Sequence, residues 1–188
     1  QGVRYKTLDW LEDGSLVLSS DRSGEPKLEV HSVPGGDVQV QEKWDIGTPY
    51  RIKAAPVGRK VAISNHRNEL MIGDLESGKL TVADSSRHLF IMGFDWSPDG
   101  RWVAYGIRTS PHTSVIRIFD TTTGRNHDVT EAVLSDWNPV FGAEGKYLYF
   151  ISTRELNPVY DDAHFDLGFP EASKLYLVTL RPDVPSPF

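Results

Sequence analysis

The amino-acid sequence predicts an all-β fold built from short repeated units, and three observations lead to that prediction. Sixteen Gly and twelve Pro are spread along the 188 residues, which suits many tight turns between many short strands. No stretch of useful length repeats its apolar residues at the 3.6-residue period of a helix. A phrase of the form strand, tight turn, strand also recurs along the chain. Together these features exclude a helical repeat and favour a series of β-hairpins.

The recurring phrase sets the size of the repeated unit. Its four copies are "LEDGSLVLSS", "PVGRKVAISN", "SPDGRWVAYG" and "AEGKYLYFIS". Each copy carries a marker glycine, namely Gly14, Gly58, Gly100 and Gly145. Consecutive marker glycines are 44, 42 and 45 residues apart, within the period of roughly 40 to 50 residues that is typical of β-propeller blades. We therefore predict one β-propeller segment of four four-stranded antiparallel blades, at approximately residues 7–47, 48–88, 89–134 and 135–188.

The third unit shows the expected strands most clearly. Its inner, second, third and outer strands are expected at residues 91–97, 101–108, 114–121 and 126–133. Second strands such as "LVLSS" and "WVAYG" are nearly continuous apolar runs, as expected for strands buried on both faces between neighbouring blades. Large aromatic side chains usually serve the core. We therefore predict core packing for Trp10, Trp96, Trp102 and Phe141.

The connections and the end of the chain decide how the units join. Third and outer strands are linked by "SVPGGDV", "DLESGKL" and "DTTTGRN", each with a Gly where a hairpin must turn. These segments do not open helices, so they are not phosphate loops, and we expect no cofactor. In the fourth unit Pro182, Pro185 and Pro187 discourage an outer strand. We therefore expect an open arc, covered by another copy or by other parts of the same protein, rather than a ring closed by residues 3–6.

Composition excludes several function classes. The net charge is −6 and no Lys/Arg cluster occurs, which argues against a nucleic-acid surface. The longest apolar runs, such as "YLYFI", are far shorter than the roughly 20 residues of a transmembrane helix, so no membrane partner is expected. Without cysteine there are no disulfides or thiolate metal sites, and a cytoplasmic location is favoured. The chain begins Gln1-Gly2, so we interpret it as a piece of something longer.

Residues 155–172 are the place where function is most expected. This insertion lies in a hairpin of the fourth unit and holds five acids and no Lys or Arg. One interpretation is a flap that projects from one propeller face, with Tyr160, Phe165 and Phe169 packed against a neighbour; another is a substrate or partner contact. Its polar cluster matches neither an EF-hand nor a zinc signature, so no metal is assigned to Asp161, Asp162, His164 and Asp166.

No catalytic residue can be assigned from the sequence. His112 and Ser114 are close together, but they fall in the predicted turn "RTSPHTS" without a nucleophile-elbow pattern. His66 lies at a polar tip between two strands. The absence of an assembled triad makes an autonomous hydrolase improbable.

Several longer phrases resemble the tricorn protease family over nearly the whole chain. They are "SNHRNEL", "WSPDGRWVAY", "TSPHTSVIRIFD", "GKYLYFISTRELNPVYD", "HFDLGFP" and "YLVTLRPDVPSPF". The resemblance implies a large prokaryotic cytosolic serine protease that trims oligopeptides produced by the proteasome. It implies a six-bladed propeller, a seven-bladed propeller, a PDZ-like domain and mixed α/β catalytic regions in the parent. This chain would be the last four blades of the seven-bladed propeller, with the catalytic Ser and His beyond Phe188.

The same resemblance implies that this propeller filters oligopeptides through a channel along its axis. Inner strands and adjoining loops should line the channel, so we place Asp9, Lys53, Asp95 and Asn138 near it. For each of them ordinary strand-end hydrogen bonding is the competing interpretation. Partners would be oligopeptide substrates, the remaining domains of the parent and, because the resemblance suggests a hexamer, further copies. The alternative is a freestanding protein-interaction propeller, which a stop codon after "VPSPF" would favour.

Overall fold

The fold is all-β, and the computed structural model describes residues 2–91, 93–155, 157–161, 166–168 and 172–187. The first sheet contains β1 (Tyr5–Trp10), β2 (Leu16–Ser20), β3 (Lys27–His31) and β4 (Val38–Val40). The second contains β5 (Pro49–Ala54), β6 (Lys60–Asn65), β7 (Glu69–Asp74) and β8 (Lys79–Ser85). The third contains β9 (Phe94–Trp96), β10 (Trp102–Arg108), β11 (Ser114–Asp120) and β12 (Arg125–Asp128). The fourth contains β13 (Asp136–Phe141), β14 (Tyr147–Ser152) and β17 (Lys174–Thr179).

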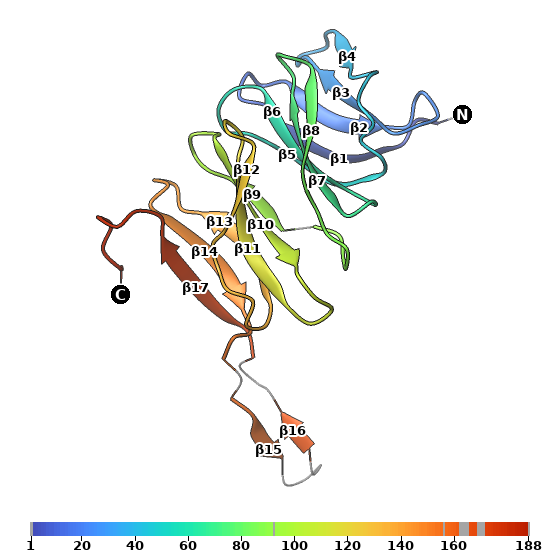
Figure 1. Ribbon diagram of the computed structural model, residues 1–188. Coiled ribbons are helices and arrows are strands. Elements are labelled where there is room, and N and C mark those ends of the chain that lie inside the picture. The colour runs from blue at the N-terminus through green and yellow to red at the C-terminus, as the bar shows by residue number, and fades with distance from the viewer. Residues whose placement is uncertain (1, 92, 156, 162–165, 169–171, 188) are drawn as a thin grey trace.

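All neighbouring strands in these sheets are antiparallel, and the sheets follow one another in chain order along an arc (Figure 1). The fourth sheet ends at its third strand, as the prolines predict. The N-terminal segment bonds within its own blade, because the Arg4 N–H donates to Asp21 Oδ1 at 2.8 Å. Within the described residues no strand joins the first sheet to the last, so the prediction of an open arc is confirmed.

The recurring Gly turns occur where the sequence places them, between the first and second strands of each sheet. The four marker glycines have φ values of 80°, 77°, 68° and 63°, in the left-handed region that favours glycine. Gly100 has a second constraint, since a Cβ there would lie 2.8 Å from the backbone oxygen of Val57 in the preceding blade. At Gly100 the turn therefore also brings the second and third blades close together.

Three of the four inner strands carry a register irregularity near their first residues. It lies between Tyr5 and Leu8 in β1, and between Pro49 and Arg51 in β5. In β13 it lies around Asn138, whose φ is 50°. Such bulges bend a strand and redirect its side chains, so these three inner strands have an altered side-chain order near their first residues.

The hydrophobic core is divided into three clusters, one at each joint between successive sheets. Trp96 is 3% exposed, which confirms its predicted core role, while Trp102 and Phe141 are half-buried. The prediction is wrong for Trp10, which is 56% exposed, because it lies on the face of the first blade that no other blade covers. Strand β14 alternates between buried and half-buried residues for the same reason, since only one of its faces has a neighbour.

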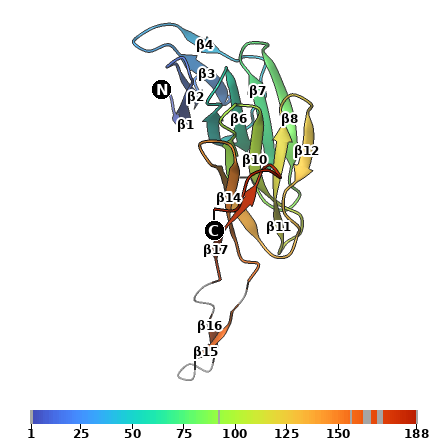
Figure 2. The same cartoon turned by 90° about the vertical axis from the view of Figure 1, so that its left-hand side faces the viewer.

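The insertion in the fourth unit forms a separate hairpin. Strands β15 (Val159–Asp161) and β16 (Asp166–Gly168) pair with each other and extend away from the fourth sheet in both views (Figures 1 and 2). The expectation that this insertion projects, instead of forming a regular outer strand, is confirmed. Searching the described residues for a helix long and apolar enough to cross a membrane finds none.

Candidate functional site

A groove of about 500 Å³ runs over the ends of the inner strands. Residues 9–12 and 53–56, at the ends of β1 and β5 and in the turns that follow, contribute most of its wall, and Asp95, Trp96, Pro98 and Ala143 complete it. Three residues placed near the channel from the sequence, Asp9, Lys53 and Asp95, come together in this groove. The structure thus brings three of the predicted channel residues, from three different blades, to one surface.

These three side chains also link each blade to the next. Asp9 Oδ2 accepts a hydrogen bond from the Ala54 N–H at 2.9 Å. Lys53 forms an ion pair with Asp95, and the other oxygen of Asp95 accepts from the Phe141 N–H at 2.8 Å. Carboxylates that accept backbone N–H bonds are held firmly in place. The groove is therefore lined by groups that also fix one inner strand against its neighbour.

This series of links between successive blades ends at the fourth blade. Counting from the marker glycines, the position of Asp9, Lys53 and Asp95 is taken there by Val140, which is 52% exposed. An apolar side chain cannot accept a backbone hydrogen bond, so this end of the arc presents no equivalent link.

Asn138 does not belong to the same groove. It lies at the bulge of β13 and lines a smaller hollow of about 260 Å³, together with Phe90, Gly93 and Trp137. Its side-chain oxygen comes so close to Gly93 that a Cβ there would be only 2.4 Å away. The structure thus separates Asn138 from the other three predicted channel residues.

The predicted hairpin residues are only partly described. Tyr160 and Asp161 lie in β15, and the Tyr160 side chain is exposed. Asp162, His164 and Phe165, and also Phe169, lie outside the described residues. In the described part of the chain no group of three metal-ligating side chains gathers. A substrate or partner contact at this hairpin stays a prediction.

Ser114 and His112 do not form a catalytic pair. The Ser114 Oγ donates to the backbone oxygen of Asp136 at 2.8 Å and accepts from its N–H at 2.9 Å. The Asp136 carboxylate accepts from Arg154 at 2.6 Å. His112 is exposed in the loop before β11. Ser114 thus joins the third blade to the fourth, and it carries no activating base.

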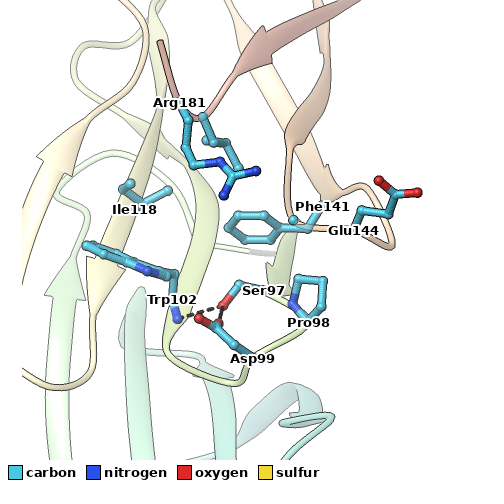
Figure 3. Close-up of a pocket in the computed structure, with 10 residues that line it drawn as sticks. Ser97, Pro98, Asp99, Trp102, Ile118, Phe141, Glu144 and Arg181 are labelled. Carbon is cyan, nitrogen blue, oxygen red and sulfur yellow. Dashed lines mark hydrogen bonds between the residues drawn. The ribbon is translucent and has the colours of Figure 1, made fainter. Parts of the chain in front are cut away.

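A second large hollow, of about 470 Å³, lies between the third and fourth blades (Figure 3). Trp102, Ile118, Phe141 and Leu180 form its apolar walls, and Asp99, Glu144 and Arg181 are its charged residues. Sequence reasoning missed this hollow because it treated Trp102 and Phe141 as core residues. The available signal was position 179, which is Thr in the fourth blade where the third blade has Asp120.

The chain is similar in sequence to a known protein family along its whole length. The sequence model of the family described as "Tricorn protease second beta propeller domain" matches residues 1–188. A tricorn-like protease C-terminal subunit of Sulfurisphaera tokodaii is 35% identical over 188 residues, which cover 100% of this chain and 21% of that protein. A tricorn protease homolog of Saccharolobus solfataricus is 31% identical over 180 residues, which cover 96% of this chain and 16% of that protein. The chain thus spans about a fifth or less of these relatives.

Solved structures give the same result for the fold. The crystal structure of the tricorn protease superimposes with a TM-score of 0.90 at 25% identity, covering 100% of this chain and 19% of that one. TolB from Acinetobacter baumannii, at 14% identity and a TM-score of 0.57, shares the fold alone; the match covers 88% of this chain and 42% of TolB. The full-length family match and the tricorn superposition agree, and this chain belongs to the tricorn protease second β-propeller family.

Proposed function

We propose that this chain is a non-catalytic propeller segment of a cytoplasmic tricorn-type serine protease, and that it filters and channels extended oligopeptides toward an active site elsewhere in the parent. The observation that carries the proposal is the groove along the inner strands, where Asp9, Lys53 and Asp95 converge. An extended peptide offers backbone N–H and C=O groups along its length, and strand edges with charged and apolar side chains suit such a ligand. We expect a channel of this kind to admit an extended peptide and to exclude a folded domain, which is wider.

The two uncovered faces support a role within a larger assembly. On the fourth blade the open face carries Val140 and Leu175, the latter 70% exposed, and on the first it carries Leu8 and Trp10. Contiguous exposed apolar side chains mark interaction surfaces. We propose that the remaining domains of the parent protease, or a further copy, cover these two faces.

The filtering role can be tested by narrowing the groove in the parent protease. Ala143 is exposed, lines the groove and makes no side-chain hydrogen bond, and these 188 residues contain no cysteine. An Ala143→Cys variant labelled with a bulky maleimide should lose most of its kcat/KM for oligopeptides. The matched control is labelled Ala132→Cys, an exposed position outside the groove. Its rate should equal that of the unlabelled enzyme.

A small serine-directed fluorophosphonate separates channel blockage from damage to the active site. It should label the parent nucleophile at the same rate in both cysteine variants. Unchanged oligopeptide hydrolysis after complete labelling of Ala143→Cys would overturn the filtering role. The 188 residues alone should neither hydrolyse peptides nor react with the fluorophosphonate, and stoichiometric labelling at one Ser would show that this segment is itself catalytic.

A further inference from the structure

The hollow between the third and fourth blades is an incompletely filled part of their shared core. Ile118, Phe141 and Leu180 pack against the buried cluster at this joint but remain only partly buried themselves. Figure 3 shows Trp102 and Ile118 on one side of the hollow, Phe141 on the other, and the Arg181 side chain reaching toward the space between them. About 470 Å³ of space lies against these walls, which falls in the usual size range of ligand pockets, roughly 300 to 1,000 Å³. An apolar group of aromatic size would bury itself there favourably.

Two of the charges at this hollow are already compensated within the protein. Asp99 Oδ1 accepts from Ser97 Oγ at 2.5 Å and from the Arg101 N–H at 3.1 Å. Glu144 forms an ion pair with Lys146 at 2.5 Å, which lowers the pKa of Glu144. Neither carboxylate is therefore the natural recognition group for a ligand.

Arg181 differs from both acids. In the described part of the chain its guanidinium makes no hydrogen bond, and its ion pair with Asp183 is long, at 3.9 Å between Nε and Oδ1. Its five N–H donors form a planar fork that matches a carboxylate. The side chain is 57% exposed, so it can meet a ligand without first leaving the core.

Position 179 offers no second acid to Arg181. In the third blade Asp120 lies opposite Trp102 and accepts two hydrogen bonds from Arg101, at 2.7 and 3.2 Å. In the fourth blade the residue opposite Tyr147 is Thr179, which has no carboxylate. The position of Asp120 therefore carries no acid in the fourth blade, and Arg181 follows two residues after it.

We propose that this hollow binds the C-terminal residue of a peptide. An apolar side chain, aromatic or branched, occupies the space between Trp102, Ile118 and Phe141, and the free α-carboxylate pairs with Arg181. Apolar walls with one unsatisfied guanidinium at their edge are complementary to this ligand, because it carries an apolar group and an anion on the same carbon atom. The site borders the groove at Pro98, but its walls and Arg181 are separate from the groove, and the proposal does not depend on the channel function.

The first experiment compares a peptide acid with its amide. Ac-Ala-Ala-Phe-OH and Ac-Ala-Ala-Phe-NH₂ are titrated into the 188-residue chain and followed by NMR chemical shifts. The acid should bind with a Kd on the order of 1 mM, as expected for a small ligand. The amide should bind roughly tenfold more weakly, because it lacks the charge-assisted hydrogen bonds to Arg181.

Variants then assign the two halves of the site. Arg181→Met keeps the apolar stem and should reduce the affinity for the acid to that for the amide. Arg87→Met, an exposed arginine in the loop before β9, is the matched control and should leave the preference unchanged. Leu180→Ala should weaken acid and amide by the same factor, since it trims a wall and leaves the cation.

Three results would each overturn the proposal. One is equal affinity for acid and amide. Another is no saturable binding of the acid at 10-fold its expected Kd, on the order of 10 mM. The third is an Arg181→Met variant that keeps the preference for the acid.

Discussion

The joint between the second and third blades and the joint between the third and fourth are built from the same repeated positions, yet only the first has an apolar cluster whose members are all buried. The hollow of about 320 Å³ at the first joint lies beside this cluster, near Lys60 and Thr121. At the first joint every member of the cluster is buried, including Trp96 and Tyr105. At the second joint the same positions, counted from the marker glycines, are Phe141 and Phe150, and six apolar side chains remain partly buried. The comparison shows that a few side chains, not the strand pattern, decide how completely the apolar cluster of a joint is buried.

The joint between the second and third blades also contains a hydrogen-bond network around the Tyr105 hydroxyl. The Tyr105 hydroxyl lies 2.7 Å from Asp84 Oδ2 and 2.8 Å from Asn126 Oδ1, and Arg117 donates to the same Asp84 oxygen at 2.8 Å. Burial raises the pKa of Tyr105 far above its usual range, and the Asp84 charge adds to this effect. The hydroxyl therefore stays protonated and links the outer strand of the second blade to the third.

The largest expected effect compares the two aromatic side chains at the ends of the inner strands. Trp96→Ala should lower the free energy of unfolding by about 4 kcal/mol, since it opens a cavity in a packed joint and removes the indole bond to the Lys53 carbonyl. Phe141→Ala should cost about 2 kcal/mol, because that ring is already half-exposed. Urea denaturation followed by circular dichroism measures both. Equal losses would mean that the two joints are packed alike.

The next effect depends on pH and concerns Asp120, whose position in the fourth blade is occupied by Thr179. Hydrogen bonds from Arg101 hold the pKa of Asp120 well below its ordinary value in the folded chain. The resulting stability is fully present above the unfolded pKa and is lost as the pH falls through the lower folded value. Asp120→Asn should cost about 2 kcal/mol at pH 7.

The pH series provides the control for Asp120. The difference in unfolding free energy between the parent chain and Asp120→Asn should shrink as the pH is lowered below about 4. A difference that stays constant from pH 7 to pH 3 would show that the carboxylate charge is not what stabilises the turn.

A smaller effect is expected from a change in the hydrogen-bond network around Tyr105. Tyr105→Phe should cost about 1 kcal/mol, because Asp84 keeps Arg117 as a partner and Asn126 keeps the Ala83 carbonyl. Thermal and urea unfolding of this single variant measure the loss. A loss of unfolding free energy above about 3 kcal/mol would mean that the other hydrogen bonds of the network depend on the Tyr105 hydroxyl.

The smallest effect restores the missing acid in the fourth blade. Thr179→Asp places a carboxylate where it can meet Lys146, as Asp120 meets Arg101, and should raise the urea midpoint only slightly because the pair is accessible to solvent. The gain should disappear in 1 M salt. Destabilisation at low salt would show that the two blades do not share this geometry.

Local features of the fold could be predicted because they are encoded by neighbouring residues. The Gly turn at Gly100 and the missing outer strand after β17 both follow from residues a few positions apart. Trp10 could not be placed correctly, because its sequence context matches that of Trp96 and only the absence of a preceding blade distinguishes them.

The sites were predicted less completely, since they depend on partners far apart in the chain. Position along the inner strands was enough to bring Asp9, Lys53 and Asp95 to one groove. Their mutual pairing was not visible, because Lys53 and Asp95 are 42 residues apart. The pocket at Arg181 requires knowing that Phe141 and Trp102 leave space between them, which only the packed side chains reveal.

Val140 has a consequence for alignment along the axis of the arc. At the first and third joints the backbone N–H groups of Ala54 and Phe141 donate directional hydrogen bonds to Asp9 and Asp95, which fix how far one inner strand is shifted relative to the next. The Val140 side chain can provide a docked strand with apolar contact, which is not directional. A strand docked beside Val140 would therefore gain no directional bond from that position, whereas Asp9 and Asp95 supply one at the first and third joints.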